Sequence, residues 1–363
     1  MIGKHRLRSA AGLVLIWALV GLTMACGTSS PSSEIVATET VEITETTAET
    51  GHSPGPAASP ADSVGRSLAP ARVAVNTRTN RIYVANQQGG SVSVIDGATN
   101  RPLAELPVGA APLGIAVNPE TNRLYVANTA SGNVFVIDGV SNEFVAAVPV
   151  ETSPKGVAVD IETNRIYVTN FASESVSIID GSTNEVIGSL SVETAPAAVA
   201  VDPSRNRVYV VNTASNTVSF IDRSEATTLA TVKVGNFKVD PSSVALNADT
   251  NRLYTANPFT DEVSVIDAGE ATIIASVAVG TRPHDVAVNP KTNRVYVANA
   301  GDGEVSVLDG ATNSIETVVA VGHRPLGVAV NPETNRIYVA NSLDDTVSVI
   351  DGATHSVIAT IAL

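Results

Sequence analysis

The sequence of 363 residues predicts an all-β protein, a seven-bladed β-propeller of four-stranded antiparallel blades. The first observation is a repeat: TNRIYVAN at 79–86 returns unchanged at 334–341, with variants at 121–128, 163–170, 205–212, 250–257 and 292–299. Five of the six intervals are 42 residues and one is 45. The second observation is that each repeat contains four segments of strand length. A fixed period of this size with four strands per unit is typical of propeller blades.

The last repeat shows the four strands, named a to d in chain order. They are GVAVN (327–331), RIYVAN (336–341), TVSVID (346–351) and SVIATIAL (356–363). The turn-forming segments NPETN, NSLDD and DGATH separate them. None of the four has a helical period, so the repeat favours strands throughout.

Two side-chain patterns recur in every repeat. All seven tyrosines, such as Tyr83, occupy one position on strand b, and we interpret them as packing between blades with a hydrogen-bonded hydroxyl. The alternative is a ligand cage. A four-residue b–c loop places Arg81 opposite Asp96, and the same register holds in the other repeats. We expect these Arg–Asp pairs to set register and to contribute about 0–1 kcal/mol each, with no catalytic role.

The N-terminal region has a different character. Residues 1–25 combine a basic start with an apolar run at 10–23. A membrane span needs about 20 residues, so this run is too short to be one. The pattern predicts a signal peptide. Cys26, the only cysteine, follows at once. This arrangement resembles a bacterial lipoprotein signal, which implies lipidation of Cys26; the alternative is an ordinary cleaved signal with an incidental cysteine. Residues 26–69 are rich in Ser, Thr, Pro and Glu and predict a disordered tether ahead of a propeller at 70–363.

The repeat also resembles the bacterial and archaeal YVTN β-propeller repeat, whose motif stands literally at Tyr167-Val168-Thr169-Asn170. The resemblance covers about residues 73–363. It implies a seven-bladed propeller that is often exported or on the cell surface, with several members in surface-layer or adhesion-type proteins. Lactonase-like and lyase propellers are more distant relatives.

Residues that interrupt the repeat are the candidates for a site. The b–c and d–a loops share one face, and most residues at the entry to strand a are small or apolar. The exceptions, with basic residues just upstream, predict a partly basic channel mouth for a small anion; the alternative is ordinary solvated loops. Because other blades have Leu, Ala, Ser or Gly at these positions, we expect the fold not to require Lys155, His284 or Asp285. The ligand-binding candidates are Arg72, Lys155, Arg282, His284, Asp285, His323 and Arg324.

A three-residue insertion explains the 45-residue interval and carries Phe237 and Lys238. Phe171 and Phe259 lie in b–c loops expected on the same face. We interpret these four residues as candidates for contact with a partner. The alternative is tolerated variation in loop length.

Ring closure can also be predicted. Strand a of the first blade begins near Val73, and Leu363 ends the seventh strand d. We therefore expect blades 1 and 7 to meet through side chains without an exchanged strand, with Val73, Val75 and Ile82 packing against blade 7.

The net charge and the absence of several motifs restrict the classes of function that the sequence allows. A net charge of −14 argues against nucleic acid as a partner. Nucleophile, phosphate-loop and zinc motifs are absent, and the one tryptophan, Trp17, lies in the predicted signal, so we expect no metal and no cofactor and assign no catalytic residue. We expect an exported, lipid-anchored monomer at the cell surface or in the periplasm, a scaffold that binds an envelope protein, a glycan or a small ligand. The alternative is an exported lactonase- or lyase-like enzyme that uses the channel mouth.

Overall fold

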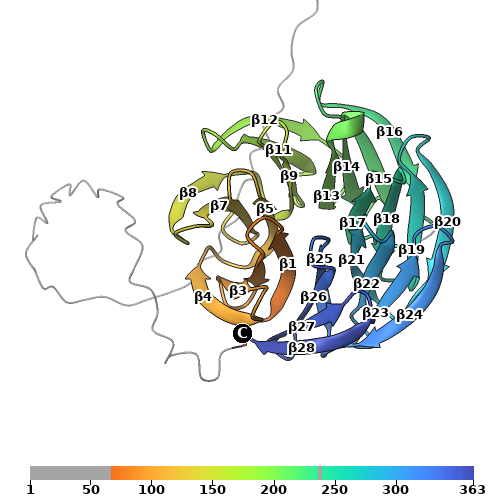
Figure 1. Ribbon diagram of the computed structural model, residues 1–363. Coiled ribbons are helices and arrows are strands. Elements are labelled where there is room, and N and C mark those ends of the chain that lie inside the picture. Colours follow the sequence, from red (N-terminus) through yellow and green to blue (C-terminus); the bar gives the residue numbers. More distant parts are fainter. Residues whose placement is uncertain (1–66, 236–238) are drawn as a thin grey trace, which may run out of the picture. The chain divides into compact units, whose positions relative to one another are not determined.

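The predicted propeller is confirmed. The computed structural model describes residues 67–235 and 239–363, which form seven four-stranded antiparallel sheets around a central axis (Figure 1). Each sheet consists of four consecutive strands, and each strand is hydrogen-bonded to its neighbours in the sequence. Strand a of each blade is innermost and strand d is outermost (Figure 1). The b–c and d–a loops therefore form one face, here called the mouth face, and the a–b and c–d turns form the other, the turn face.

The strand bounds follow the repeat. Blades 1 to 4 comprise β1 (Pro70–Asn76), β2 (Arg81–Asn86), β3 (Ser91–Asp96), β4 (Arg101–Pro107); β5 (Pro112–Asn118), β6 (Arg123–Asn128), β7 (Asn133–Asp138), β8 (Phe144–Pro149); β9 (Pro154–Asp160), β10 (Arg165–Asn170), β11 (Ser175–Asp180), β12 (Glu185–Ser191); β13 (Pro196–Asp202), β14 (Arg207–Asn212), β15 (Thr217–Asp222) and β16 (Thr227–Lys233). Blades 5 to 7 comprise β17 (Ser243–Asn247), β18 (Arg252–Asn257), β19 (Glu262–Asp267), β20 (Thr272–Ala278); β21 (Pro283–Asn289), β22 (Arg294–Asn299), β23 (Glu304–Asp309), β24 (Ser314–Ala320); β25 (Pro325–Asn331), β26 (Arg336–Asn341), β27 (Thr346–Asp351) and β28 (Ser356–Ala362).

One a–b turn forms a short 3₁₀ helix, η2 (Pro203–Arg205). Its sequence reads DPSRN where the last repeat reads NPETN. The Asp202 side chain accepts a hydrogen bond from the Arg205 backbone N–H at 3.3 Å, and Pro203 presets the first helical φ.

The core lies between blades. The seven tyrosines are among the most buried side chains, and Tyr83 of blade 1 packs with Leu124 and Val126 of blade 2. Packing between blades is thus confirmed. No described partner meets full hydrogen-bond geometry at the seven hydroxyls. Burial raises the pKa of Tyr83, Tyr167 and Tyr254, and a hydrogen-bonding contact from the arginine two residues earlier in the chain opposes that rise. In blade 1 this arginine, Arg81, also donates from Nη1 to the Gly139 carbonyl at 3.1 Å. Burial raises the pKa of Tyr125 to about 12.

The predicted Arg–Asp register is confirmed in all seven blades, as in Arg81 opposite Asp96. Among the described residues, side-chain ion pairs form across three of these positions: Arg207–Asp222 at 3.5 Å, Arg294–Asp309 at 3.0 Å and Arg336–Asp351 at 3.0 Å. In blades 1 and 5 the arginine instead donates to a c–d turn carbonyl of the next blade, Gly139 or Gly310. The recurrent arginine therefore also joins neighbouring blades.

On the turn face, an asparagine at the end of strand a donates to an asparagine in the a–b turn of the next blade. Five blade junctions carry this bond at 2.6–2.8 Å: Asn76–Asn122, Asn118–Asn164, Asn247–Asn293, Asn289–Asn335 and Asn331–Asn80. The last of these joins blade 7 to blade 1. At the other two junctions strand a ends in Asp160 or Asp202, and Asp160 pairs with Arg223 Nη1 at 2.9 Å.

The expected ring closure holds within the described residues. Val73 and Ile82 of blade 1 pack with Tyr338, Val349 and other apolar side chains of blade 7, with Val75 against the same cluster, and neither sheet contains an exchanged strand. Asp345 of blade 7 contacts both the residues just before β1 and the residue just after β28. Its carbonyl accepts from Leu363 N at 3.0 Å, and its Oδ1 accepts from Leu68 N at 2.9 Å and Ala69 N at 2.8 Å.

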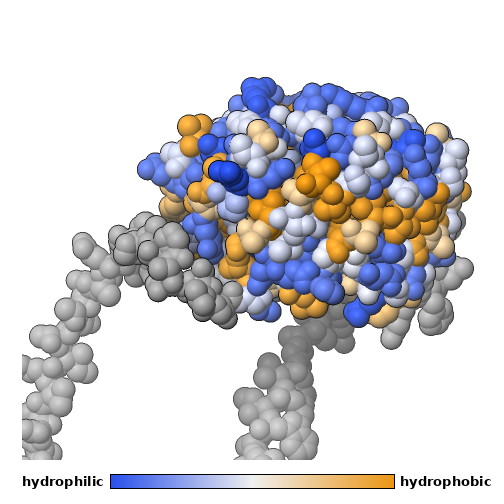
Figure 2. Space-filling model, turned by 60° about the horizontal axis from the view of Figure 1, so that its bottom comes forward, coloured by the Kyte–Doolittle hydropathy of each residue, from blue (hydrophilic) through white to orange (hydrophobic). Residues whose placement is uncertain are grey.

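The outer strands expose apolar side chains to solvent. Figure 2 shows apolar surface in a band across the side of the propeller, between more hydrophilic faces. Each of the seven outer strands has an exposed large apolar side chain: Leu103, Phe144, Ile187, Leu229, Ile274, Ile315 and Ile358. These residues continue the apolar pattern of strand d on its second, outward-facing side.

Candidate functional site

The d–a loops of the mouth face share one backbone feature. Each d–a loop contains a residue with positive φ, between 46° and 60°, followed by a proline that opens strand a or, in blade 5, lies two residues before it. In chain order these residues are Ala69, Ala111, Ser153, Ala195, Asp240, Arg282 and Arg324. Five of the seven are small or short, and this conformation disfavours any side chain with a β-carbon. The backbone therefore does not call for arginine at blades 6 and 7.

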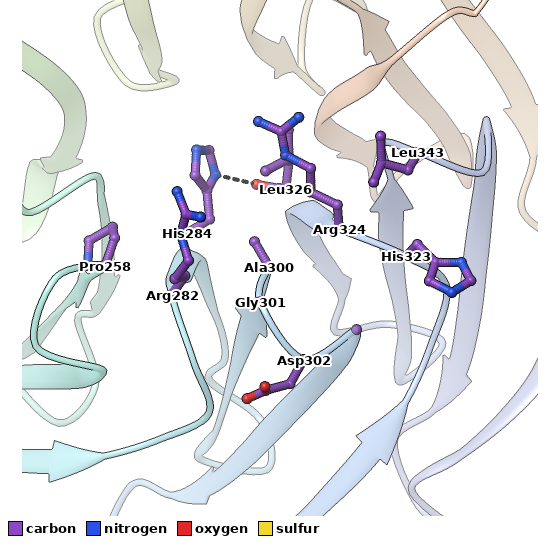
Figure 3. A pocket seen from close by; sticks show the side chains of 11 residues that line it. Pro258, Arg282, His284, Ala300, Gly301, Asp302, His323, Arg324, Leu326 and Leu343 are labelled. Carbon is purple, nitrogen blue, oxygen red and sulfur yellow. Dashed lines mark hydrogen bonds between the residues drawn. The ribbon is translucent and has the colours of Figure 1, made fainter.

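Four of the seven predicted ligand-binding residues line one cavity. The cavity has a volume of about 400 Å³ and lies at the loops of blades 5, 6 and 7 (Figure 3). The predicted residues in its lining are Arg282, His284, His323 and Arg324. Further lining residues that sequence reasoning missed are Pro258, Ala300, Gly301, Asp302, Gly303, Leu326 and Leu343. Most of these belong to b–c loops, whose differences from blade to blade were the signal available in the sequence.

The two arginines give the cavity its positive charge. Arg282 and Arg324 are exposed, and neither guanidinium forms an ion pair with a described residue. The carboxylate in the cavity lining, Asp302, accepts from both the hydroxyl and the backbone N–H of Thr281, which lowers its pKa. His323 differs: its Nδ1 lies 2.8 Å from Asp344 Oδ1 and its ring is 83% exposed. The arginines, rather than His323, are thus available to an anion.

His284 is held as a neutral acceptor. Its Nδ1 lies 2.8 Å from the Leu326 carbonyl oxygen of the next blade (Figure 3). A carbonyl only accepts, so this contact assigns the proton to Nδ1 and leaves a lone pair on Nε2. Burial, with a contribution from the Arg72 charge, lowers the pKa of His284 to about 4. The imidazole is therefore uncharged at neutral pH.

Arg72 and Asp285 form a strut across the channel. Arg72 starts in blade 1, pairs with the Asp285 carboxylate of blade 6, and donates from Nη2 to the Ser242 carbonyl of blade 5 at 3.2 Å. Asp285 also accepts from the Ser243 hydroxyl and from Val328 N at 3.0 Å. The charge of Arg72 is neutralised by this pair.

The contacts of Asp285 correct one expectation. Small residues at the equivalent positions of other blades indicated that the fold does not require this side chain. Asp285 is 7% exposed and joins blades 1, 5, 6 and 7 through its two carboxylate oxygens. A side chain that breaks the repeat has here acquired structural contacts that the repeat does not show.

Lys155 lies apart from the cavity, in β9 of blade 3. Its Nζ is 3.3 Å from the ring centroid of Phe171, a cation–π contact. Burial, together with the Arg72 charge, lowers the pKa of Lys155. The ring of Phe171 is therefore covered by this lysine, whereas Phe259 is 68% exposed beside the cavity residue Pro258.

Three predicted residues, Phe237, Lys238 and Cys26, lie outside the described residues. Within residues 67–235 and 239–363, no group of three or more His, Cys, Asp or Glu side chains is arranged to hold a metal ion. The same residues include no helix of the length and hydropathy needed to cross a bilayer.

The comparisons with known proteins agree with the geometry of the fold. The family model described as lactonase, 7-bladed beta-propeller, matches residues 150–309. A search of the curated proteins finds no match. Among solved structures, hydrazine synthase of Kuenenia stuttgartiensis is similar with a TM-score of 0.71 and 19% identity, covering 78% of this chain and 96% of that one. A streptogramin B lyase is similar with a TM-score of 0.67 and 12% identity, covering 76% and 92%. Together, the family model and these structures support the seven-bladed propeller fold.

Proposed function

We propose that the protein binds a small organic anion in the cavity at blades 5, 6 and 7. The observation that carries this proposal is the pair of exposed guanidiniums, Arg282 and Arg324, on the cavity wall without a carboxylate partner among the described residues. A guanidinium binds a carboxylate through two parallel hydrogen bonds, which gives orientation as well as attraction. The neutral Nε2 of His284 adds an acceptor for a hydroxyl on the same ligand.

The charge distribution supports a specific site. The chain as a whole carries −14, so it repels anions in general. Two unpaired arginines at positions of positive φ oppose both that overall charge and the backbone preference. An anion that binds here is held by local contacts and not by the overall field.

Titration calorimetry with acetate, propionate and lactate tests the proposal. We expect Arg282→Ala and Arg324→Ala each to weaken binding about tenfold, as the loss of a charged hydrogen bond implies. Arg101→Ala is the matched control, because Arg101 is exposed on the outer strand β4. Unchanged affinity in the Arg282→Ala, Arg324→Ala double variant would refute the site.

A second candidate function is lactone hydrolysis at the same cavity. It is favoured by the lactonase family model, whose match at 150–309 includes Arg282 and His284. In this reaction His284 Nε2 takes a proton from water, whose oxygen adds to the ester carbonyl while a guanidinium stabilises the oxyanion. The ring C–O bond then breaks, and its oxygen takes the proton back from His284 to give a hydroxy acid, whose carboxyl group loses its own proton to solvent. Hydrolysis of γ- and δ-lactones by the wild type and not by His284→Gln would support this function; equal rates would exclude His284 as the base.

The cellular setting is also proposed. The basic and apolar start before Cys26, and the resemblance to YVTN-repeat proteins, support an exported propeller anchored through lipid on Cys26. In this setting a monomer presents its mouth face to a small ligand, and its b–c loops to an envelope protein or a glycan. Labelling with a fatty-acid analogue tests the anchor: the wild type is labelled and Cys26→Ser is not. Equal labelling of the two would contradict it.

A further inference from the structure

Three basic side chains of the mouth face that have no carboxylate partner among the described residues fall into two groups on opposite sides of the channel. Arg282 and Arg324 belong to blades 6 and 7. Lys155 belongs to β9 of blade 3, where it follows Pro154 as His284 follows Pro283 in β21. Lys155 and His284 therefore stand at the same height on their strands, and β9 and β21 lie on opposite sides of the centre (Figure 1).

Lys155 lacks an anionic partner among the described residues. Its ammonium rests on the Phe171 ring, a cation–π contact. This contact stabilises a partly buried ammonium less than water does, so the site favours the arrival of an anion. The Asp285 carboxylate is not an anionic partner for Lys155, because it pairs with Arg72.

Arg72 is bonded on the side of the channel that holds the arginines. Its guanidinium pairs with Asp285, the residue after His284, and donates to the Ser242 carbonyl. Because Arg72 is neutralised by Asp285, it does not add an unpaired cation to either group. A ligand that meets both groups must span the channel between blade 3 and blades 6 and 7 (Figure 1).

We propose that the ligand is a dianion, one carboxylate bound by Arg282 and Arg324 and a second bound by Lys155. This inference rests on the proposed anion-binding function and adds the ligand class. Two linked anionic groups bind more tightly than one when their spacing matches the two positions, because the second contact is made within the complex. Phe171 acts as a positioning residue, since its ring holds the ammonium in place.

The experiment is calorimetry on the full chain with dicarboxylates from malonate to pimelate, each compared with the monocarboxylate of the same number of carbons. We expect one chain length to bind about tenfold more tightly than its matched monocarboxylate. A Lys155→Met variant should lose this preference and keep its affinity for monocarboxylates. A Lys155→Arg variant should retain the preference, because it retains the charge.

The outcomes separate this inference from the function on which it rests. Arginine-dependent monocarboxylate binding without a dicarboxylate preference at any length overturns the dianion alone. A preference that survives in Lys155→Met also overturns it, provided that the variant melts at the wild-type temperature. If no carboxylate binds, the anion site and the dianion fail together.

Discussion

The two faces of the propeller differ in how closely the ends of the inner strands follow the repeat. On the turn face, five of seven blade junctions carry the same asparagine–asparagine bond, which also closes the ring between Asn331 and Asn80. On the mouth face, the entries to strand a hold Arg72, Lys155, Ser243 or Asp285 beside glycines and alanines. The repeat is thus retained at one end of the inner strands and relaxed at the other.

The physical reason lies in what each side chain must do. On the turn face, Asn76 Oδ1 accepts from the backbone N–H groups of Arg78 and Thr79 while its Nδ2 donates to Asn122. A side chain with both a donor and an acceptor is needed, so substitution is restricted.

The mouth face offers two solutions instead of one. At Gly114, a β-carbon would lie 2.0 Å from the Lys155 carbonyl oxygen, so the close approach of strands requires glycine there. Ser243 and Asp285 take the other solution, a side-chain hydrogen bond across the junction of blades 5 and 6. Because either solution joins the blades, this face tolerates the differences on which a binding site depends.

The largest effect is expected where the turn face departs from its own pattern. Asp160 is fully buried and pairs with Arg223, which stands where most other blades have glycine. Arg223→Ala leaves a buried carboxylate without its cation and should lower the free energy of unfolding by about 3–5 kcal/mol. Denaturant unfolding followed by circular dichroism measures the loss.

The double variant Asp160→Asn, Arg223→Gly sharpens the same comparison. It recreates the residues of the other junctions, so that the new amide at position 160 can donate to Asn206 as Asn118 does to Asn164. We expect it to recover at least half of the lost stability. A double variant no more stable than Arg223→Ala would show that the asparagine bond depends on features absent from the junction of blades 3 and 4.

The two faces also explain how far the sequence predicts the structure. The segments 336–341 and 346–351 match β26 and β27, because period, turn residues and register all act within one blade. Strand β25 begins at Pro325, two residues before the predicted segment, because Pro325 pairs with Asn341 across a bulge. The Arg72–Asp285 strut was not predictable from the sequence. It joins blades 1 and 6, which come close to each other only when the ring closes. The surroundings of the tyrosine hydroxyls were not predictable for a similar reason, because the partners of Arg81 include the next blade.

A smaller effect is expected from His284 on the mouth face. Its pKa is about 4 in the folded protein against an ordinary value of 6.5, so between these values the unfolded chain binds more protons. The wild type should therefore lose about 2–3 kcal/mol of stability as pH falls from about 6.5 to 4. The measurement is denaturant unfolding at half-unit steps of pH.

His284→Gln should remove this part of the pH dependence, whereas His323→Gln should keep it because His284 is still present. Both substitutions are on the mouth face, which makes them a matched pair. Parallel curves for the wild type and His284→Gln in this window would contradict the burial of a neutral imidazole at this site.

The smallest effect is expected where blade 7 meets blade 1. Two loops of the mouth face can be compared directly there. Asp261 and Asp345 occupy the same b–c loop position; Asp261 Oδ1 accepts from Arg282 N at 2.7 Å, and Asp345 Oδ1 accepts from Leu68 N and Ala69 N. At Asp261 the chain runs on covalently from blade 5 to blade 6, so losing the carboxylate leaves the loop tied at both ends. At Asp345 the segment before β1 is tied to blade 7 by hydrogen bonds and packing alone.

Asp345→Ala should therefore cost about 1–2 kcal/mol and Asp261→Ala less, although each removes one carboxylate. Hydrogen exchange at Leu68 and Ala69 gives the local readout: it should accelerate in Asp345→Ala and stay unchanged in Asp261→Ala. Equal losses in the two variants, with protection at Leu68 retained, would mean that the packing of Val73 and Ile82 on blade 7 closes the ring without help from Asp345.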